Sequence, residues 1–446
     1  MFDLENAVEN LSQAIQFKTI SYADYDRVDY KIYDEFLDFL KNSYPNVHRV
    51  CKLEMLNEYC PVYILESETK GKKPILLLGH YDVVPVGKTN EAHWEEEPFS
   101  GAVKDGFIWG RGTLDDKNQV IAVMEAIEHT ISEDIKFDRD IYMVFGFDEE
   151  VGGKRGAEKA AEVFKERNIQ FECVLDEGGA IITDMLEGLT APLALVGTAE
   201  KGSNNIRITV KGKDGHSSMP PMNTAVGTLA KLITNVEKTP MPARLISPVK
   251  DMFQTMAPYV TGKSFILKNT ERLFPFIQST LAKDATTNSL IRTTIAFTMI
   301  EGSQAANVLP KTASAIANVR VLQGDSLESA IEHIRKVNPN IEFEVEKLLV
   351  EEPSEISNVD ADSYKILTQT INKIYPEAVA LPYLMVGGTD SRKYFHLCEN
   401  IYRFSAVILS KTDFDTIHSN NEKISIQNFS NMIKFYIEFL SNYLSS

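Results

Sequence analysis

The sequence predicts an α/β protein in which a mostly parallel-sheet domain is interrupted by a smaller inserted α+β domain of two layers. Two patterns predict this architecture. Dense apolar runs alternate with helical patterns in both outer parts of the chain, whereas the strands of the middle part alternate apolar and polar residues. The chain has 446 residues, more than one ordinary hydrophobic core accommodates, so at least two domains are expected.

The outer parts of the chain contain the elements of the parallel-sheet domain. Residues 1–45 have apolar residues at helical spacing, and residues 119–130 and 155–167 repeat that pattern. Strands buried on both faces are predicted by four apolar runs: PILLLGHYDVVP from residue 74, IYMVFGF before Asp148, FECVL before Asp176, and FSAVIL ending at Leu409. We therefore expect one domain formed by residues 1–200 and 351–446.

The middle of the chain, residues 201–350, has a different pattern. Strands with period-two alternation are predicted at residues 204–212, 293–302 and 312–324, and helices at residues 223–239 and 326–337. Half-buried strands accompanied by two helices predict a separate inserted domain.

The composition excludes several classes of protein. A formal net charge of −17 argues against a nucleic-acid binder, although acidity also simply keeps a protein soluble. The four cysteines form no CxxC pair, which favours a reducing compartment. Neither a signal-peptide pattern at the N-terminus nor a run of eighteen apolar residues is evident, so a cytoplasmic protein without a membrane span is expected.

Each motif with reactive side chains has an ordinary structural interpretation when it is taken alone. His80 and Asp82 share one face of a strand end, which is weak evidence for a site. Asp115 and Asp116 open a helix, where acids are favourable in any protein. Three adjacent acids from Asp148, however, repel one another unless a cation or water compensates.

Taken together, these motifs predict a metal site. In open α/β sheets, ligands bind outside the carboxyl ends of the strands. Imidazole and carboxylate ligands suit zinc, cobalt or manganese, and the set has one residue too many for a single tetrahedral zinc, so two metals are expected. The residues at or just after predicted strand ends are His80, Asp115, Glu149, Glu150, Asp176 and His418.

The motifs also resemble a known family. GHYDVVPV, WEEEPFSG, DGFIWGRGTLDDK, FGFDEEVGG, LDEGG, GKDGHSSMP and NVLP are similar, in the same order, to the co-catalytic zinc family that includes carboxypeptidase S, glutamate carboxypeptidase, dipeptidases and aminoacylases. The resemblance runs from about residue 75 to residue 418, and its wording is nearest to the branch of carboxypeptidase S and the N-fatty-acyl-amino-acid hydrolases. Those eukaryotic relatives have a membrane anchor or signal sequence, which is not expected here.

The resemblance implies roles for the strand-end residues. Asp115 would bridge two Zn²⁺ ions, for which Co²⁺ or Mn²⁺ could substitute, and the peptide between Asp115 and Asp116 would be cis. Glu149 would be the general base, and Asp82 would orient His80. The remaining ligands would divide between the two metals, with His80 and Asp176 on one and Glu150 and His418 on the other.

The resemblance also implies substrate-binding residues. His216 of the GHSS motif would reach the scissile carbonyl, in dimeric relatives from the neighbouring subunit, although a surface histidine in a glycine-rich turn is the alternative. Asn307 and Arg320 would bind substrate, and the guanidinium of Arg320 suits a carboxylate unless it serves an ordinary salt bridge. The pocket floor would be formed by Gly387, Gly388 and Thr389.

These expectations define a function. We expect a two-zinc hydrolase that cleaves the amide bond preceding a free C-terminal carboxylate in short peptides. An N-acyl-amino-acid deacylase is the alternative and differs only upstream of the scissile amide. The presence of Glu149 beside a full ligand set disfavours a third interpretation, a non-catalytic metal-binding relative. Residues 201–350 would act as a lid or as the dimerisation domain of a homodimer.

Overall fold

A large sheet lies at the centre of the computed structural model, which describes residues 2–87, 91–184 and 187–444. Its strand order is β1-β2-β6-β3-β7-β17-β9-β8-β18, and β16 also pairs with β9. Strands β3, β6, β7 and β17, which are parallel neighbours, form its middle, so the predicted mostly parallel sheet is confirmed. The ten strands are β1 Lys52–Leu56, β2 Cys60–Leu65, β3 Ile75–His80, β6 Ile141–Gly146, β7 Cys173–Asp176, β8 Ile181–Ile182, β9 Leu193–Glu200, β16 Val379–Met385, β17 Ile401–Arg403 and β18 Ile408–Leu409.

One predicted strand is wrong. The apolar run at residues 404–409 is buried except for its half-buried Ile408, but only its last two residues form a strand, β18, and the preceding strand β17 ends at Arg403. The N–H of Phe404 donates to the carbonyl of Asp176, the last residue of β7, and the N–H of Ser405 donates to the Gly179 carbonyl beyond that strand. A buried loop and a buried strand have the same apolar pattern, which explains the error.

Helices cover the large sheet. Helix α5, which begins directly after the Asp115–Asp116 pair, is apolar almost all round because it lies between β3 and the helices α1, α3 and α15. Helix α6 packs on β6, and α13 packs on α15. These helices are α1 Leu4–Gln16, α2 Tyr30–Ser43, α3 Pro45–Val50, α5 Lys117–Ser132, α6 Ala157–Glu166, α13 Asp362–Ile374 and α15 Ile426–Leu444, joined by the short α14 Lys411–Phe414, η1 Tyr25–Arg27, η2 Glu149–Val151 and η4 Asp390–Tyr394.

A second, four-stranded antiparallel sheet is formed by the middle of the chain, in the order β12-β14-β10-β15. Burial alternates along β10 and β14, and the buried face packs against α7 and α12, as expected for a two-layer α+β unit. Its elements are β10 Gly202–Lys211, β12 Thr294–Glu301, β14 Thr312–Val321, β15 Glu344–Leu349, α7 Ala225–Lys238 and α12 Leu327–Val337. Two small sheets complete the strands: β11 Gly215–His216 with β13 Val308–Leu309, and β4 Val103–Lys104 with β5 Phe107–Trp109 and β19 Lys423–Ser425.

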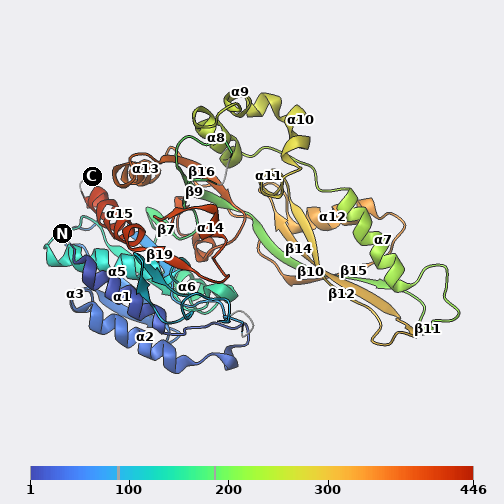
Figure 1. Ribbon diagram of the computed structural model, residues 1–446, viewed down its shortest axis with the longest axis horizontal. Coiled ribbons are helices and arrows are strands. Elements are labelled where there is room, and N and C mark those ends of the chain that lie inside the picture. Colours follow the sequence, from blue (N-terminus) through green and yellow to red (C-terminus); the bar gives the residue numbers. More distant parts are fainter. Residues whose placement is uncertain (1, 88–90, 185–186, 445–446) are drawn as a thin grey trace.

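The sequence did not predict the helices between α7 and β12. They form a group with its own apolar core, which includes Leu193 of β9 and Leu381 of β16, so this part of residues 201–350 packs against the large sheet. The group lies above both sheets in Figure 1. It consists of α8 Ser247–Met256, η3 Ala257–Tyr259, α9 Ser264–Lys268, α10 Thr270–Leu281 and α11 Ala285–Ile291.

The two connections between the sheets run side by side. Strand β9 continues through Lys201 into β10, and the chain returns after β15. The N–H of Ser203 donates to the carbonyl of Glu351, and the N–H of Ser354 donates to that of Glu200. In Figure 1 the four-stranded sheet extends away from the large one, with β11 at its far tip. Among the described residues, no helix is both long and apolar enough to cross a bilayer.

Candidate metal centre and substrate cavity

His80 ends β3 and is fully buried at the carboxyl edge of the large sheet. Its Nδ1 lies 3.0 Å from the backbone carbonyl oxygen of Asp82 and 3.4 Å from that residue's Oδ1. Because both neighbours of Nδ1 are acceptors, Nδ1 donates its proton, and the lone pair of a neutral imidazole is left on Nε2. Asp82 also accepts the backbone N–H groups of Glu149 and Glu150, so one carboxylate holds both the histidine and the acidic turn.

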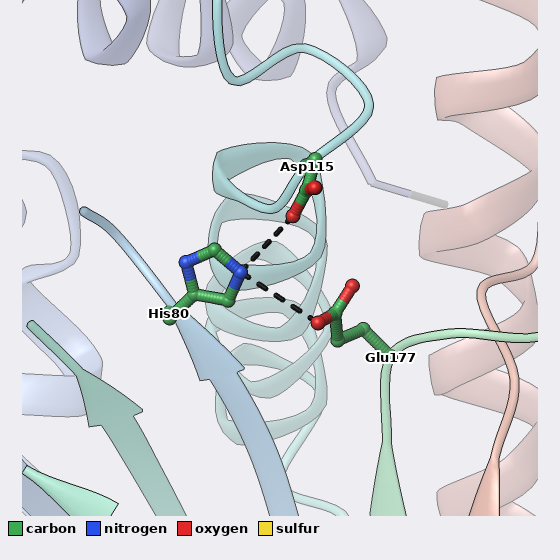
Figure 2. A group of neighbouring side chains, drawn as sticks. All are labelled: His80, Asp115 and Glu177. Atoms are coloured by element: carbon green, nitrogen blue, oxygen red, sulfur yellow. Dashed lines mark hydrogen bonds and ion pairs between the residues drawn. The ribbon is translucent and has the colours of Figure 1, made fainter. Parts of the chain in front are cut away.

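The Nε2 atom of His80 faces two carboxylates. It lies 3.1 Å from Oδ1 of Asp115 and 3.7 Å from Oε1 of Glu177 (Figure 2). A lone pair directed at two anions is repelled unless a cation or a proton lies between them. This first group of potential ligands therefore consists of His80, Asp115 and Glu177.

A second group shares Asp115 with the first. The Oδ2 atom of Asp115 lies 2.9 Å from Nε2 of His418, and Oε1 of Glu150 lies 3.2 Å from the same nitrogen. Asp115 thus directs one oxygen to each group, which is the arrangement of a bridging carboxylate. The peptide bond between Asp115 and Asp116 is cis, as predicted.

The pKa values in these groups describe a site that holds protons when metal is absent. Burial lowers the pKa of His80, but hydrogen bonds to Asp115 and Asp82 outweigh burial and raise that pKa well above its usual value. Hydrogen bonds to Asp115 and Glu150 raise the pKa of His418 to about 10. Burial, followed by the charge of Asp115, raises the pKa of Glu177 to about 7. A divalent cation would displace such protons.

Asp176, which the sequence analysis assigned as a ligand, does not join the first group. Strand β7 extends through Asp176, and both of its carboxylate oxygens accept backbone N–H groups, Oδ1 from Glu177 and Oδ2 from Ser391. Its neighbour Glu177 takes the position beside His80 instead. The sequence signal was present, since two acids follow the same strand, but which of them faces His80 depends on where that strand ends.

Glu149 belongs to neither ligand group. It lies in the turn η2, and in the described part of the chain it forms no ion pair with His80 or His418. Burial raises the pKa of Glu149 well above its usual value, and the nearby charge of Asp390 adds to the shift while that of His80 opposes it. Its carboxylate therefore favours binding a proton in the metal-free protein.

A cavity of about 500 Å³ joins both ligand groups to the four-stranded sheet. Three of the predicted substrate-binding residues line it, Arg320 from β14 and Gly388 and Thr389 from the loop after β16. The residues of the two ligand groups on its wall are Asp115, Glu150, Glu177 and His418, and the candidate base Glu149 lines it as well.

Arg320 is a half-buried cation in this cavity. Its Nε donates to Oδ1 of Asn318 at 3.0 Å, and among the described residues no acidic side chain forms an ion pair with its guanidinium. Burial, followed by the charge of Arg392, lowers the pKa of Arg320. Within the described part of the chain, therefore, the surface salt bridge considered as an alternative is not formed.

The pocket floor rests on a buried ion network that the sequence analysis missed. The backbone N–H and Oγ1 of Thr389 both donate to Glu200, a fully buried residue at the end of β9. Glu200 also pairs with Arg392 and Arg403. Arg392 lies in the VGGTDSR motif, but nothing in the sequence around Glu200 distinguishes it from an ordinary strand-end acid. The third floor residue, Gly387, is not part of the cavity wall.

His216 and Asn307, two further predicted active-site residues, are not among the residues that line the cavity. His216 is on β11 and is exposed, and its Nδ1 contacts Oγ of Ser218 at 2.8 Å. Asn307 lies beside it, because its carbonyl accepts the N–H of Ser217. Strand β11 is at the tip of the four-stranded unit furthest from the large sheet (Figure 1), so neither residue joins the ligand groups of its own chain.

The chain is similar to a known family of peptidases. Residues 76–442 match the model of peptidase family M20/M25/M40. A probable carboxypeptidase S-like 2 of Dictyostelium discoideum is 36% identical over 99% of this chain and 85% of its own. The N-fatty-acyl-amino acid synthase/hydrolase PM20D1 of Xenopus tropicalis is 34% identical over 98% of this chain and 85% of its own. The crystal structure of an M20 family metallo-carboxypeptidase, Sso-CP2 from Sulfolobus solfataricus, matches with a TM-score of 0.71 at 18% identity, over 99% of both chains, and shows the same fold.

Proposed function

Because this chain belongs to peptidase family M20/M25/M40 and is a hydrolase, we propose that it is a two-zinc enzyme that cuts the amide bond preceding a free carboxylate in short peptides. One observation supports this proposal above all others: Asp115 directs one oxygen to His80 and the other to His418. A carboxylate between two imidazoles, with a further acid beside each, suits a pair of divalent ions better than a single one.

The donor set fits zinc. Two imidazole nitrogens and three carboxylates are borderline ligands that suit Zn²⁺, Co²⁺ or Mn²⁺ and differ from the all-oxygen set that Ca²⁺ prefers. The proposed ligands are His80, Asp115 and Glu177 for one position and Asp115, Glu150 and His418 for the other. When bound, such ions polarise an amide carbonyl and lower the pKa of water toward neutrality.

The remaining residues of the site move protons and orient groups. Glu149 lines the same cavity as residues of both ligand groups, and we assign it to take the proton of the attacking water and deliver it to the leaving nitrogen. Asp82 keeps the Nδ1 proton on His80 and fixes the turn that holds Glu149. That pair of contacts makes Asp82 a positioning residue.

The substrate carboxylate is assigned to Arg320. Its guanidinium lies in the same cavity as the ligand groups and has no acidic partner among the described residues, so its terminal nitrogens remain available for a bidentate contact. Gly388 and Thr389 would form the floor beneath the carboxyl-terminal end of the substrate. This arrangement supports cleavage next to a free carboxylate.

His216 is assigned to the active site of a second copy of the chain. It lies too far out on the four-stranded unit to reach its own ligand groups, and Asn307 lies beside it. Strand β12, an edge of that sheet, exposes Met299 and Ile300, and apolar edge strands of this kind favour association. A homodimer through residues 201–350 would deliver both residues to the partner's cavity.

An N-acyl-amino-acid deacylase is the second candidate, and the similarity to an N-fatty-acyl-amino acid hydrolase favours it. Both activities need the same ligands and the same carboxylate contact, and they differ in the group upstream of the amide. A panel of dipeptides and N-acyl amino acids, assayed with zinc-loaded protein, separates the two candidates. If the enzyme cleaves no dipeptide and no N-acyl amino acid, the proposed function is wrong.

The carboxylate contact is tested with amidated substrates. Replacing the terminal carboxylate with an amide, or Arg320 with alanine, removes a charged hydrogen-bond pair and should reduce kcat/KM by about 10–100-fold, mainly through KM. The two changes should not add, because each removes the same contact. Equal cleavage of the free acid and its amide would show that Arg320 is not the carboxylate-binding residue.

A cytoplasmic location is proposed on the state of the cysteines. Cys51, Cys60, Cys173 and Cys398 are all free and buried, which is typical of a protein from a reducing compartment.

A further inference from the structure

Three segments that are far apart in the sequence supply the second ligand group: two loops, and the turn η2 that carries Glu150. The Asp115 loop, residues 110–116, connects β5 to α5, and the His418 loop, residues 415–422, connects α14 to β19. His418 has a left-handed backbone with φ 58°, and its side chain is 49% exposed. His80, in contrast, is fixed in a central strand. The position of His418 beside Asp115 therefore depends on the contacts that hold these two loops together.

Glu422 links the His418 loop to the Asp115 loop. It is fully buried, and its Oε1 accepts the backbone N–H groups of Gly112 at 3.0 Å and of Leu114 at 2.8 Å. Its backbone carbonyl accepts the N–H of Gly110 at 2.9 Å. A residue at the end of the His418 loop thus fixes three backbone groups of the loop that presents Asp115. One of them, the N–H of Leu114, is adjacent to Asp115 itself.

Arg111 links the two loops in the reverse direction. Its guanidinium donates through Nη1 to Oε2 of Glu422 and through Nη2 to the backbone carbonyl of Ser419 at 2.9 Å. Ser419 is adjacent to His418. Arg111 is itself buried, at 3% exposure, and its Cζ lies 5.6 Å above the ring of Trp94. The pair therefore contacts the backbone next to both ligands without contacting either ligand side chain.

We propose that Arg111 and Glu422 are positioning residues that hold His418 against Asp115 and so determine the metal affinity of the second position. The inference rests on the proposed two-metal centre. An outer residue that orients a ligand typically accounts for about 10–100-fold in metal affinity. Here the effect should fall mainly on the second position, because the first shares only Asp115 with it. The other ligands of the first position, His80 and Glu177, lie at the ends of β3 and β7, and in the described part of the chain neither contacts the pair.

Metal titration tests this inference. The metal-free wild type, Glu422→Gln and Arg111→Lys proteins are titrated with Zn²⁺ in competition with a chelator, and with Co²⁺ while the visible absorption of the bound ion is followed. In both variants we expect the second site to be weakened by about 10–100-fold, and the first site, which shares only Asp115 with it, to be weakened less. Activity should fall at limiting zinc and recover when zinc is raised. Arg111→Lys keeps the charge beside Glu422 but cannot also hold the Ser419 carbonyl.

Glu125→Gln is the matched control. Glu125 is another buried carboxylate, on α5, where it accepts hydrogen bonds from Asn10 and Tyr44 far from both loops. Its loss should lower the melting temperature and leave both metal affinities unchanged. If Glu422→Gln fails to fold, Arg111→Lys decides the result by the same titration.

The outcomes separate this inference from the proposed function. A wild type that binds fewer than two ions contradicts the two-metal centre itself. A wild type that binds two ions, with a folded Glu422→Gln or Arg111→Lys variant that binds both with unchanged affinity, overturns the positioning role and leaves the proposed function intact.

Discussion

Glu149 and Glu150 are neighbours in sequence, but Glu149 is assigned as the general base and Glu150 as a metal ligand. Oε1 of Glu150 lies 3.2 Å from Nε2 of His418, whereas Glu149 lines the cavity outside both ligand groups. Glu149→Gln keeps the size of the side chain and removes the proton acceptor, so turnover should fall by at least about 10²–10⁴-fold while two metals stay bound. Turnover and elemental analysis of the same sample measure both effects.

Glu150→Gln is the comparison for that experiment. It should lose metal and activity together, because it removes a proposed ligand. A fully metal-loaded Glu149→Gln enzyme that works within a few-fold of the wild type would remove the assigned base and the proton path that depends on it.

Asp176 and Glu177 allow a second test at the same scale. Glu177→Gln should weaken the metal position at His80, since it removes one of three ligand oxygens or nitrogens in that group. Asp176→Asn should leave two metals bound and lower the melting temperature, because the carboxylate of Asp176 holds the N–H groups of Glu177 and Ser391. Metal titration and thermal unfolding are measured on both variants. The opposite pattern would restore Asp176 as the ligand.

The sequence was informative about single residues where their chemistry was unusual. A histidine or an acid at a strand end stands out, and His80, Asp115, Glu150 and His418 do lie together. The sequence could not determine whether Asp176 or Glu177 faces His80, because successive strand residues face opposite sides and β7 ends one residue later than expected. Neither Glu200 nor Glu422 could be identified, since their importance comes only from partners distant in the chain.

Among the elements, β11 makes the most specific prediction. If His216 serves a second copy, mixing the two inactive variants Glu149→Gln and His216→Ala restores activity. In a mixed dimer one cavity then combines an intact Glu149 with the intact His216 of the other copy. When equal amounts of the two variants exchange subunits at random, half of the dimers are mixed and each mixed dimer has one complete site. The mixture should therefore recover about a quarter of the wild-type activity, averaged over all sites. Activity is measured after the mixed variants are partly unfolded and refolded together.

If mixing the two variants does not restore activity, the assignment of His216 to the partner's cavity is tested further. If the mixture stays inactive while size-exclusion chromatography shows mixed dimers, His216 does not act in the partner's cavity. The single variant His216→Ala then tells whether the residue matters at all.

Elements were predictable where a pattern has only one structural meaning. The alternation in β10 and β14 and the helices α7 and α12 follow directly from period two and period 3.6. The run at residues 404–409 was misassigned because burial alone does not define a strand. Helices α8–α11 were not predicted, and the apolar core to which they belong includes residues of β9 and β16 from other parts of the sequence.

For the whole molecule, the crowding of acids predicts a pH-dependent stability of the metal-free protein. The pKa of Glu177 is raised to about 7 by burial and by Asp115, and burial raises that of Glu149 and Asp390 well above the usual value. Between about pH 5 and pH 7 the folded chain therefore binds more protons than the unfolded chain, so the free energy of unfolding falls as pH rises. The raised pKa of His80 acts in the same direction.

Thermal unfolding of the chelated protein at pH 5, 6 and 7 measures this slope. The lowered pKa values of Lys117 and Lys201, both about 7 because of burial, oppose it only above that range. With saturating zinc the melting temperature should instead rise with pH, since the ligands must be deprotonated to bind metal. A metal-free protein that becomes more stable from pH 5 to pH 7 would contradict the assigned pKa shifts.

The position of β17 in the large sheet has a consequence for biosynthesis. Strands β7 and β9, on either side of it, leave the ribosome before the four-stranded unit, whereas β17 leaves after it. Domains fold as units during translation, so the inserted unit can be complete while the sheet that it interrupts still lacks a strand between β7 and β9. His418 follows later still. A nascent chain arrested before residue 401 would thus be catalytically inert and would present two open strand edges to other chains.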